Sequence, residues 1–261
     1  MVFLRSLAFN VFFYVHTFVW LILMLPTEVM PRAALMWSVK TWARINRHAL
    51  SIIGGVRVEL RGLSNIPAGG ALIASKHQST FETVSLLDLF SDPTYVLKKE
   101  LLSIPLFGWY AVKADQIPVD RKAGRAALIA MTERARVEVG RGRQLIIYPE
   151  GTRRPAGADP AYKHGIVNLY RDLGVPLVPV ALNSGLFWPR HGFLRHPGTL
   201  VLEFLPPIPP GRDPEEVFLD LQRAIETATD DLIAEALAAP NPPPLPPEGE
   251  PWRRRRATSS S

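Results

Sequence analysis

The chain of 261 residues contains no cysteine. Disulfide bonds, thiolate zinc sites, iron–sulfur clusters and a cysteine nucleophile are therefore excluded, and a reducing compartment is allowed. The sequence also lacks the G-x-S-x-G motif of hydrolases, the P-loop motif of nucleotide-binding proteins and the H-E-x-x-H motif of metalloproteases. With 47% hydrophobic and 21% charged residues, the composition excludes a wholly disordered chain, a collagen and a polytopic membrane protein.

The net charge of +6 is unevenly placed along the chain. Residues 1–47 carry five basic groups and one acid, whereas residues 48–240 carry 21 of each sign. A nucleic-acid-binding domain needs a basic excess on its folded body, so no nucleic-acid partner is expected. The N-terminal excess lies beside apolar sequence, which indicates an anionic membrane surface as the partner.

Residues 2–25 form a mostly apolar run that is long enough to cross a bilayer. Its one charge is Arg5, and Asn10, His16 and Thr17 interrupt the run. No small-x-small cleavage site follows, so a cleavable signal peptide is not expected. The stretch from Pro31 to Ile53 reads as a second helix with an apolar face. The two helices predict membrane association, through one spanning helix or through two helices in one leaflet. Packing of both on the globular core alone is the less favoured alternative.

A spanning first helix would leave the body of the chain on the cytoplasmic side, because the basic excess follows it. The sequence therefore predicts a location at the cytoplasmic membrane, with the body facing the cytoplasm.

From residue 54 onward, short β-branched runs alternate with helical stretches. The expected strands are 56–60, 71–75, 94–97, 116–119, 144–148, 177–182 and 200–205, and the expected helices are 80–90, 123–139, 163–173 and 213–239. This alternation predicts an α/β fold with a mixed, mostly parallel sheet of about seven strands flanked by helices. We expect three parts: the helix pair at 1–53, the α/β domain at 54–239 and a disordered Pro/Arg-rich tail at 240–261.

His77 and Glu82 lie where an expected strand passes into a helix. Residues five apart do not meet on one continuous helix, but a turn lets the imidazole fold back to the carboxylate. Such a pair suits general-base catalysis, since the carboxylate fixes the tautomer and the second ring nitrogen takes a proton. The alternative is a capping box, in which Ser79 and Glu82 only cap the helix.

Cationic and polar residues follow three other expected strands. The sequence Glu150-Gly151-Thr152-Arg153 offers backbone N–H groups, a hydroxyl and a guanidinium, which together suit a phosphate. Arg121 and Lys99 close two more strands. Because ligands gather outside strand ends in α/β sheets, these residues predict one pocket for an anionic substrate.

Four blocks occur in a fixed order along the chain: His77-x4-Glu82, Ile117-Pro-Val-Asp-Arg121, Tyr148-Pro-Glu-Gly-Thr-Arg153 and Val175-Pro-Leu-Val-Pro-Val-Ala-Leu182. In these blocks the chain resembles the glycerolipid acyltransferases, and most closely the bacterial 1-acyl-sn-glycerol-3-phosphate acyltransferases. The resemblance covers roughly residues 54–210, and the helix pair matches the family's membrane-docking element. One departure is Glu82, where the family usually has aspartate.

The resemblance implies acyl transfer from acyl-CoA or acyl-carrier protein to the sn-2 hydroxyl of a lysophosphatidic acid, without a cofactor, a metal or a covalent intermediate. His77 would deprotonate the hydroxyl, and Glu82 would orient and stabilise the imidazole. Arg121 and Arg153 would hold the phosphate. The remaining implied site residues shape, order or support that pocket: Lys99, Glu150, Gly151 and Thr152. The implied partners are the lysophospholipid, the acyl thioester, the bilayer and, as one of the two donors, acyl-carrier protein.

Two alternatives remain open at the level of the sequence. The first is acylation of another lysolipid, such as a lyso-ornithine lipid, for which Arg121 and Arg153 would be dispensable. The second is a non-catalytic lipid-binding protein, for which His77 would be dispensable.

Overall fold

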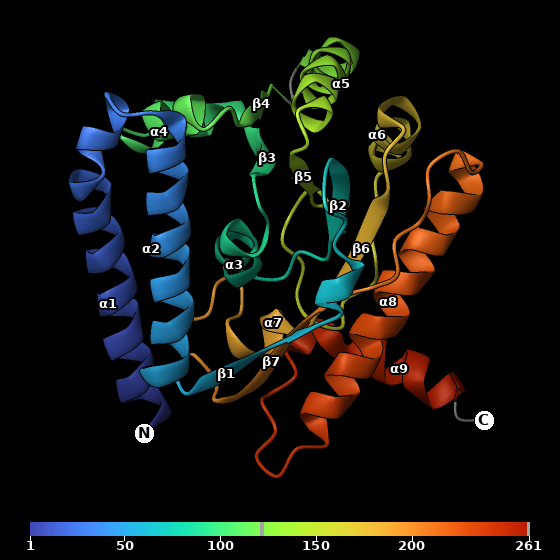
Figure 1. Cartoon of the computed structure of the whole chain (residues 1–261). Helices are drawn as coiled ribbons and strands as arrows, with labels where there is room; N and C mark the ends of the chain where they lie inside the picture. Colours follow the sequence, from blue (N-terminus) through green and yellow to red (C-terminus); the bar gives the residue numbers. More distant parts are fainter. Residues whose placement is uncertain (121–122, 260–261) are drawn as a thin grey trace.

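The computed structural model describes residues 1–120 and 123–259, and these residues form a seven-stranded sheet with helices on both sides (Figure 1). The strands are β1 (Val56–Arg61), β2 (Ala71–Ser75), β3 (Pro93–Lys98), β4 (Ile117–Val119), β5 (Gln144–Ile147), β6 (Leu177–Leu182) and β7 (Gly198–Phe204). Their order is β1-β7-β6-β2-β5-β3-β4, and neighbouring strands are parallel apart from the antiparallel pair β6 and β7. The predicted mixed, mostly parallel sheet is confirmed.

Side chains of the central strand alternate between two cores. Ile73 of β2 packs into the core on one face, and Leu72 packs into the core on the other. Both neighbours along the sheet are parallel, so β2 is buried on both faces and reads as a continuous apolar run. The first core includes residues of α3 (Phe81–Leu89), and the second is covered by α5 (Gly124–Gly140), α6 (Gly165–Leu173) and α8 (Pro214–Leu237).

Several short helical segments were not expected from the sequence, and three of them contribute residues to the site described below. They are the 3-10 segment η3 (Lys99–Ser103) and the helices α4 (Phe107–Lys113) and α7 (Ser184–Phe187). Each has at most seven residues, which is too few to show a helical period.

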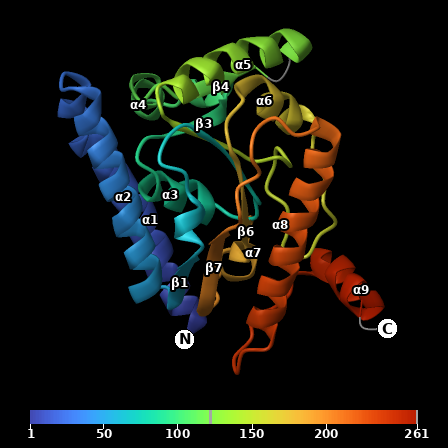
Figure 2. The ribbon, with the colours of Figure 1, turned by 45° about the vertical axis from the view of Figure 1, so that its right-hand side comes forward.

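The N-terminal hairpin of α1 (Val2–Leu23) and α2 (Arg32–Ile52) runs along one side of the molecule (Figures 1 and 2). The polar residues that interrupt the apolar run face the protein. Asn10 Oδ1 accepts a hydrogen bond of 2.6 Å from Arg195 Nη2, and Thr17 Oγ1 accepts one of 3.3 Å from Trp42 Nε1. Asn10 thus fixes α1 to the body and Thr17 fixes it to α2, while apolar side chains face outward.

The outer face of α1 carries large exposed apolar side chains at helical spacing: Leu4, Leu7, Val11, Tyr14, Val15, Phe18 and Ile22. Among the residues that the structure describes, α1 is the one helix long and apolar enough to cross a membrane, and only 17% of its most apolar window is buried. Packing on the core alone therefore leaves most of this apolar surface uncovered.

The prediction of a disordered tail is wrong for residues 250–259, which form α9 (Glu250–Ser259). Trp252 donates its indole N–H to the carbonyl of Asp230 at 3.1 Å, and Arg255 lies 3.0 Å from the carboxylates of both Asp230 and Asp159. The tail has too few apolar residues for a core of its own, but it docks on carboxylates far away in the sequence. Composition alone does not show where such opposite charges meet.

We expect Trp252→Ala to lower the free energy of unfolding by about 1–2 kcal/mol, because a partly buried indole and its hydrogen bond are lost. The neighbouring change Arg253→Ala should stay within about 0.5 kcal/mol, since that side chain is mostly exposed. Thermal unfolding of the detergent-purified variants measures both. Equal stability of the two variants, or trypsin cleavage of the folded wild type at its arginine run before any other site, would contradict a docked tail.

Candidate active site

His77 lies in the turn that connects β2 to α3. Its Nδ1 donates to Glu82 Oε1 at 2.8 Å, so the contact predicted from the sequence is present. The His77 side chain is 14% exposed and the Glu82 side chain is fully buried. Because the carboxylate accepts from Nδ1, Nε2 is the nitrogen that can take a proton from a substrate.

Glu82 also accepts hydrogen bonds from the backbone of the turn before α3. Its Oε1 accepts from the backbone N–H groups of Gln78 at 2.7 Å and Ser79 at 2.6 Å. Its Oε2 accepts from Ser184 Oγ of α7 at 2.8 Å. One carboxylate therefore contacts the imidazole and also the backbone of the turn before α3, so a purely capping role for Glu82 does not describe its contacts.

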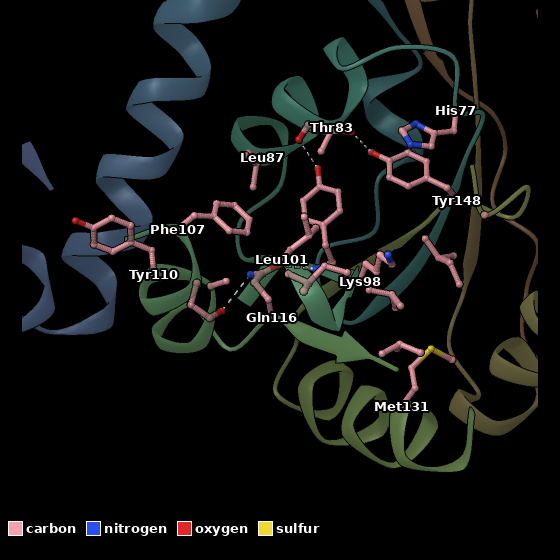
Figure 3. A pocket seen from close by; sticks show the side chains of 18 of the residues that line it. His77, Thr83, Leu87, Lys98, Leu101, Phe107, Tyr110, Gln116, Met131 and Tyr148 are labelled. Atoms are coloured by element: carbon pink, nitrogen blue, oxygen red, sulfur yellow. Dashed lines mark hydrogen bonds between the residues drawn. The ribbon is translucent and has the colours of Figure 1, made fainter. Parts of the chain in front are cut away.

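Tyr148, at the end of β5, supports the other side of the imidazole. The two rings stack with centroids 3.8 Å apart and an interplanar angle of 15° (Figure 3). The Tyr148 hydroxyl lies 3.3 Å from Thr83 Oγ1, and burial raises the pKa of this phenol above its ordinary value. Tyr148 therefore stays neutral, restricts the rotation of the imidazole and offers a π-face to a positive charge on it.

The loop after β5 is bonded directly to the histidine turn. The Arg154 N–H donates to the carbonyl of His77 at 2.8 Å, and Arg153 Nη1 donates to Thr80 Oγ1 at 2.9 Å. Gly151 has a φ of +68°, and a Cβ there would lie 2.9 Å from Lys163 Nζ. The first and third sequence blocks thus meet at one edge of the sheet.

A cavity of about 670 Å³ begins at His77 and extends toward the N-terminal hairpin. Its lining is mostly apolar and comes from elements far apart in the sequence, as Figure 3 shows for Leu87, Phe107, Tyr110 and Met131. The α1 and α2 helices contribute Trp20, Met24, Met36 and Trp42. An imidazole held by a buried carboxylate therefore lies between the loop that carries Arg153 and a mostly apolar cavity.

Comparison with known proteins agrees with this geometry. An acyltransferase family model matches residues 57–183. The 1-acyl-sn-glycerol-3-phosphate acyltransferase of Pseudomonas aeruginosa is 32% identical over 234 residues, which cover 89% of this chain and 91% of that protein. The chain belongs to the 1-acyl-sn-glycerol-3-phosphate acyltransferase family. It is therefore an acyltransferase, and the non-catalytic alternative is set aside.

Two further matches agree with this family. The human 1-acyl-sn-glycerol-3-phosphate acyltransferase alpha is 29% identical over 167 residues, which cover 62% of this chain and 59% of that protein. The crystal structure of the 1-acyl-sn-glycerophosphate acyltransferase from Thermotoga maritima shares the fold, with a TM-score of 0.75 and 22% identity. The match covers 89% of this chain and 98% of that one.

The other predicted site residues of this acyltransferase lie in different surroundings. Thr152 is exposed on the loop after β5. Lys99 begins η3, where its Nζ lies 3.7 Å from Asp120 Oδ2 and its side chain is 65% exposed. The strand end contributes Lys98 rather than Lys99 to the cavity lining, because the 3-10 turn directs Lys99 toward Asp120. Arg121 lies outside the described residues.

Glu150 is buried behind the loop, in an ion cluster that the sequence did not predict. Lys76 Nζ lies 3.1 Å from Glu150 Oε1 and 2.6 Å from Glu226 Oε1 of α8. Burial raises the pKa of the Glu150 carboxyl, and the Lys76 ammonium opposes that rise. Glu150 thus orders the loop from inside. The position of Lys76, directly after a buried strand and before His77, was the one feature of the sequence that could have indicated a buried charge. Nothing in the sequence near Glu226 indicated that it pairs with Lys76.

We expect Lys76→Met to lower the free energy of unfolding by about 3 kcal/mol, because the buried Glu150 and the partly buried Glu226 lose their shared counter-charge. The exposed control Lys99→Met should change it by less than about 0.5 kcal/mol. Thermal unfolding of this acyltransferase in detergent measures the difference, and equal shifts for the two lysine variants would rule out a structural role for the buried cluster.

Proposed function

We propose that this acyltransferase moves a fatty acyl group from an acyl thioester to the sn-2 hydroxyl of 1-acyl-sn-glycerol 3-phosphate and so forms phosphatidic acid. The observation that carries the proposal is the 2.8 Å bond between His77 Nδ1 and Glu82 Oε1, placed between an apolar cavity and the loop of Gly151 to Arg153. The names of the relatives from Pseudomonas aeruginosa and human support the choice of acceptor.

In the proposed reaction, His77 Nε2 takes the proton of the acceptor hydroxyl as its oxygen attacks the thioester carbonyl. Glu82 holds the Nδ1–H tautomer and stabilises the imidazolium, and the face of Tyr148 lies against the same ring. The carbon–sulfur bond breaks as the new ester forms, and the imidazolium returns its proton to the leaving thiolate. Either acyl-CoA or acyl-carrier protein supplies the thioester in this scheme.

The phosphate of the acceptor would lie at the loop after β5. Arg153 presents a guanidinium beside the histidine turn, and Gly151 lets the backbone approach a ligand closely. Arg121 and Thr152 are the further proposed ligands, and Lys99 adds positive potential from outside the cavity. Lys163, which lines the cavity next to Gly151, is a cation that the sequence motifs did not indicate.

The acyl chains would occupy the apolar cavity, and the N-terminal hairpin would hold the enzyme at the bilayer. The exposed apolar face of α1 supports this placement, since it needs a non-aqueous partner. We propose residues 1–53 as the membrane-associated part, residues 54–239 as the acyltransferase domain, and the cytoplasmic face of the membrane as its location.

We expect His77→Ala to lower kcat about 10²–10⁴-fold, because the general base is removed. Glu82→Gln should lose more activity than Glu82→Asp, which keeps the charge. Thiol release from acyl-CoA and from acyl-carrier protein, with lysophosphatidic acid as acceptor, measures these effects. His48→Ala, an exposed histidine on α2, is the control and should match the wild type. A His77→Ala enzyme that keeps more than a tenth of the wild-type rate would refute the general-base role.

We expect Arg153→Ala to raise KM for lysophosphatidic acid about tenfold or more, because a charge-assisted contact is lost. Arg153→Lys should recover only part of the loss, since lysine cannot bind bidentately. The exposed Arg171→Ala is the matched control. Initial rates with lysophosphatidic acid and with a lyso-ornithine lipid separate the acceptors: an equal effect of Arg153→Ala on both would show that this arginine does not bind phosphate.

A further inference from the structure

The segment from Lys99 to Lys113, which we call the η3–α4 segment, exposes large apolar side chains although it lies far from α1 in the sequence. Trp109 is 59% exposed and Val112 is 62% exposed, and both lie on one face of α4, three residues apart. Ile104, just before α4, is also exposed. An isolated apolar residue at a surface needs no explanation, but a cluster that includes tryptophan indicates an interaction site.

This segment is fixed to the tip of the N-terminal hairpin. Lys113 Nζ donates to the carbonyls of Met30, at 2.7 Å, and Glu28, and the Tyr110 hydroxyl donates to the carbonyl of Leu21 at 2.7 Å. Figures 1 and 2 both show α4 beside the turn between α1 and α2. The hairpin tip exposes its own apolar side chains, namely Leu23, Leu25, Val29 and Met30. Both regions therefore expose apolar side chains at the same end of the molecule, where hydrogen bonds join them.

The backbone just before α4 keeps the segment in this position. Leu106 has a φ of +64°, and the Phe107 N–H donates to the carbonyl of Pro105 at 2.8 Å, which closes a strained three-residue turn. The Leu106 side chain packs against the cluster of Met24, Leu35 and Met36. Packing against the hairpin therefore holds a conformation that leucine rarely adopts.

The inner side of the same segment borders the cavity that begins at His77. Leu101, Phe107 and Tyr110 line it, together with Trp20 of α1 and Met24, which directly follows α1. The η3–α4 segment carries two lysines and one glutamate, a net charge of +1, and Lys98 directly precedes it. This basic excess suits anionic headgroups. An acidic carrier protein would meet the same lysines, but the apolar surface shared with the hairpin tip favours a bilayer.

We propose that the η3–α4 segment is a second membrane contact, which enters the bilayer together with the tip of the N-terminal hairpin. Lipid substrates then pass between the bilayer and the cavity along Leu101 and Phe107 without crossing water. The inference rests on the proposed function, since it assumes that the substrates reside in a membrane.

The absence of cysteine makes a direct test simple, because one introduced cysteine carries the only label. Val112→Cys is labelled with an environment-sensitive dye in the full-length protein. The protein is then added to vesicles of phosphatidylcholine and phosphatidylglycerol that contain doxyl-labelled lipid. Phe18→Cys on α1, 64% exposed, is the positive control, and Leu219→Cys on α8, 60% exposed, is the matched negative control. We expect quenching at position 112 to approach that at position 18, with none at 219.

Dye at position 112 that behaves like dye at position 219 would overturn the proposal, and quenching at position 18 would show at the same time that α1 still binds the membrane. A change in the dye signal at position 112 when acyl-carrier protein is added, without quenching in vesicles, would assign the surface to the carrier. That result would also overturn the proposal. Neither fluorescence measurement depends on turnover. Failure of the proposed reaction is therefore distinguished from failure of this inference.

A second measurement tests the passage of substrate. The double variant Trp109→Ser/Val112→Ser should lower kcat/KM about tenfold with lysophosphatidic acid in vesicles, and much less with the same acceptor in detergent micelles. Leu219→Ser should change neither value. An equal loss in vesicles and in micelles would contradict a role in membrane contact.

Discussion

The geometry of the site depends on the hydrogen bonds that the buried carboxylate of Glu82 accepts. It accepts hydrogen bonds from the imidazole, from two backbone N–H groups of the preceding turn and from a hydroxyl of α7. These donors come from three different parts of the site, namely the imidazole, the turn before α3 and the segment after β6. The carboxylate is therefore fixed before any substrate arrives, and the imidazole takes its orientation from a rigid partner.

Much of the fold could be predicted because its main elements are locally encoded. The buried run of β2 and the helical period of α8 were visible in the sequence, and their bounds differ from the expected ones by at most two residues. The contact of His77 with Glu82 was also within reach, since both residues lie in one strand–turn–helix unit.

The remainder depends on partners that are far apart in the chain. Lys76 finds Glu226 across 150 positions, and Arg255 finds Asp159 across 96. Charge composition predicts that such groups form ion pairs, but it does not predict which residues pair. The same limit explains α4, a helix of seven residues whose position is set by contacts with the hairpin rather than by its own propensity.

The docking of α9 has a practical consequence. Asp230, which accepts hydrogen bonds from Trp252 and Arg255, lies one helical turn after Glu226, which accepts one from Lys76, the residue before His77. The last helix and the start of the histidine turn are thus attached to adjacent turns of α8. A bulky tag or fusion partner joined directly to the C-terminus would disturb the contacts of α9 with Asp230. A long flexible linker after the final residue avoids this.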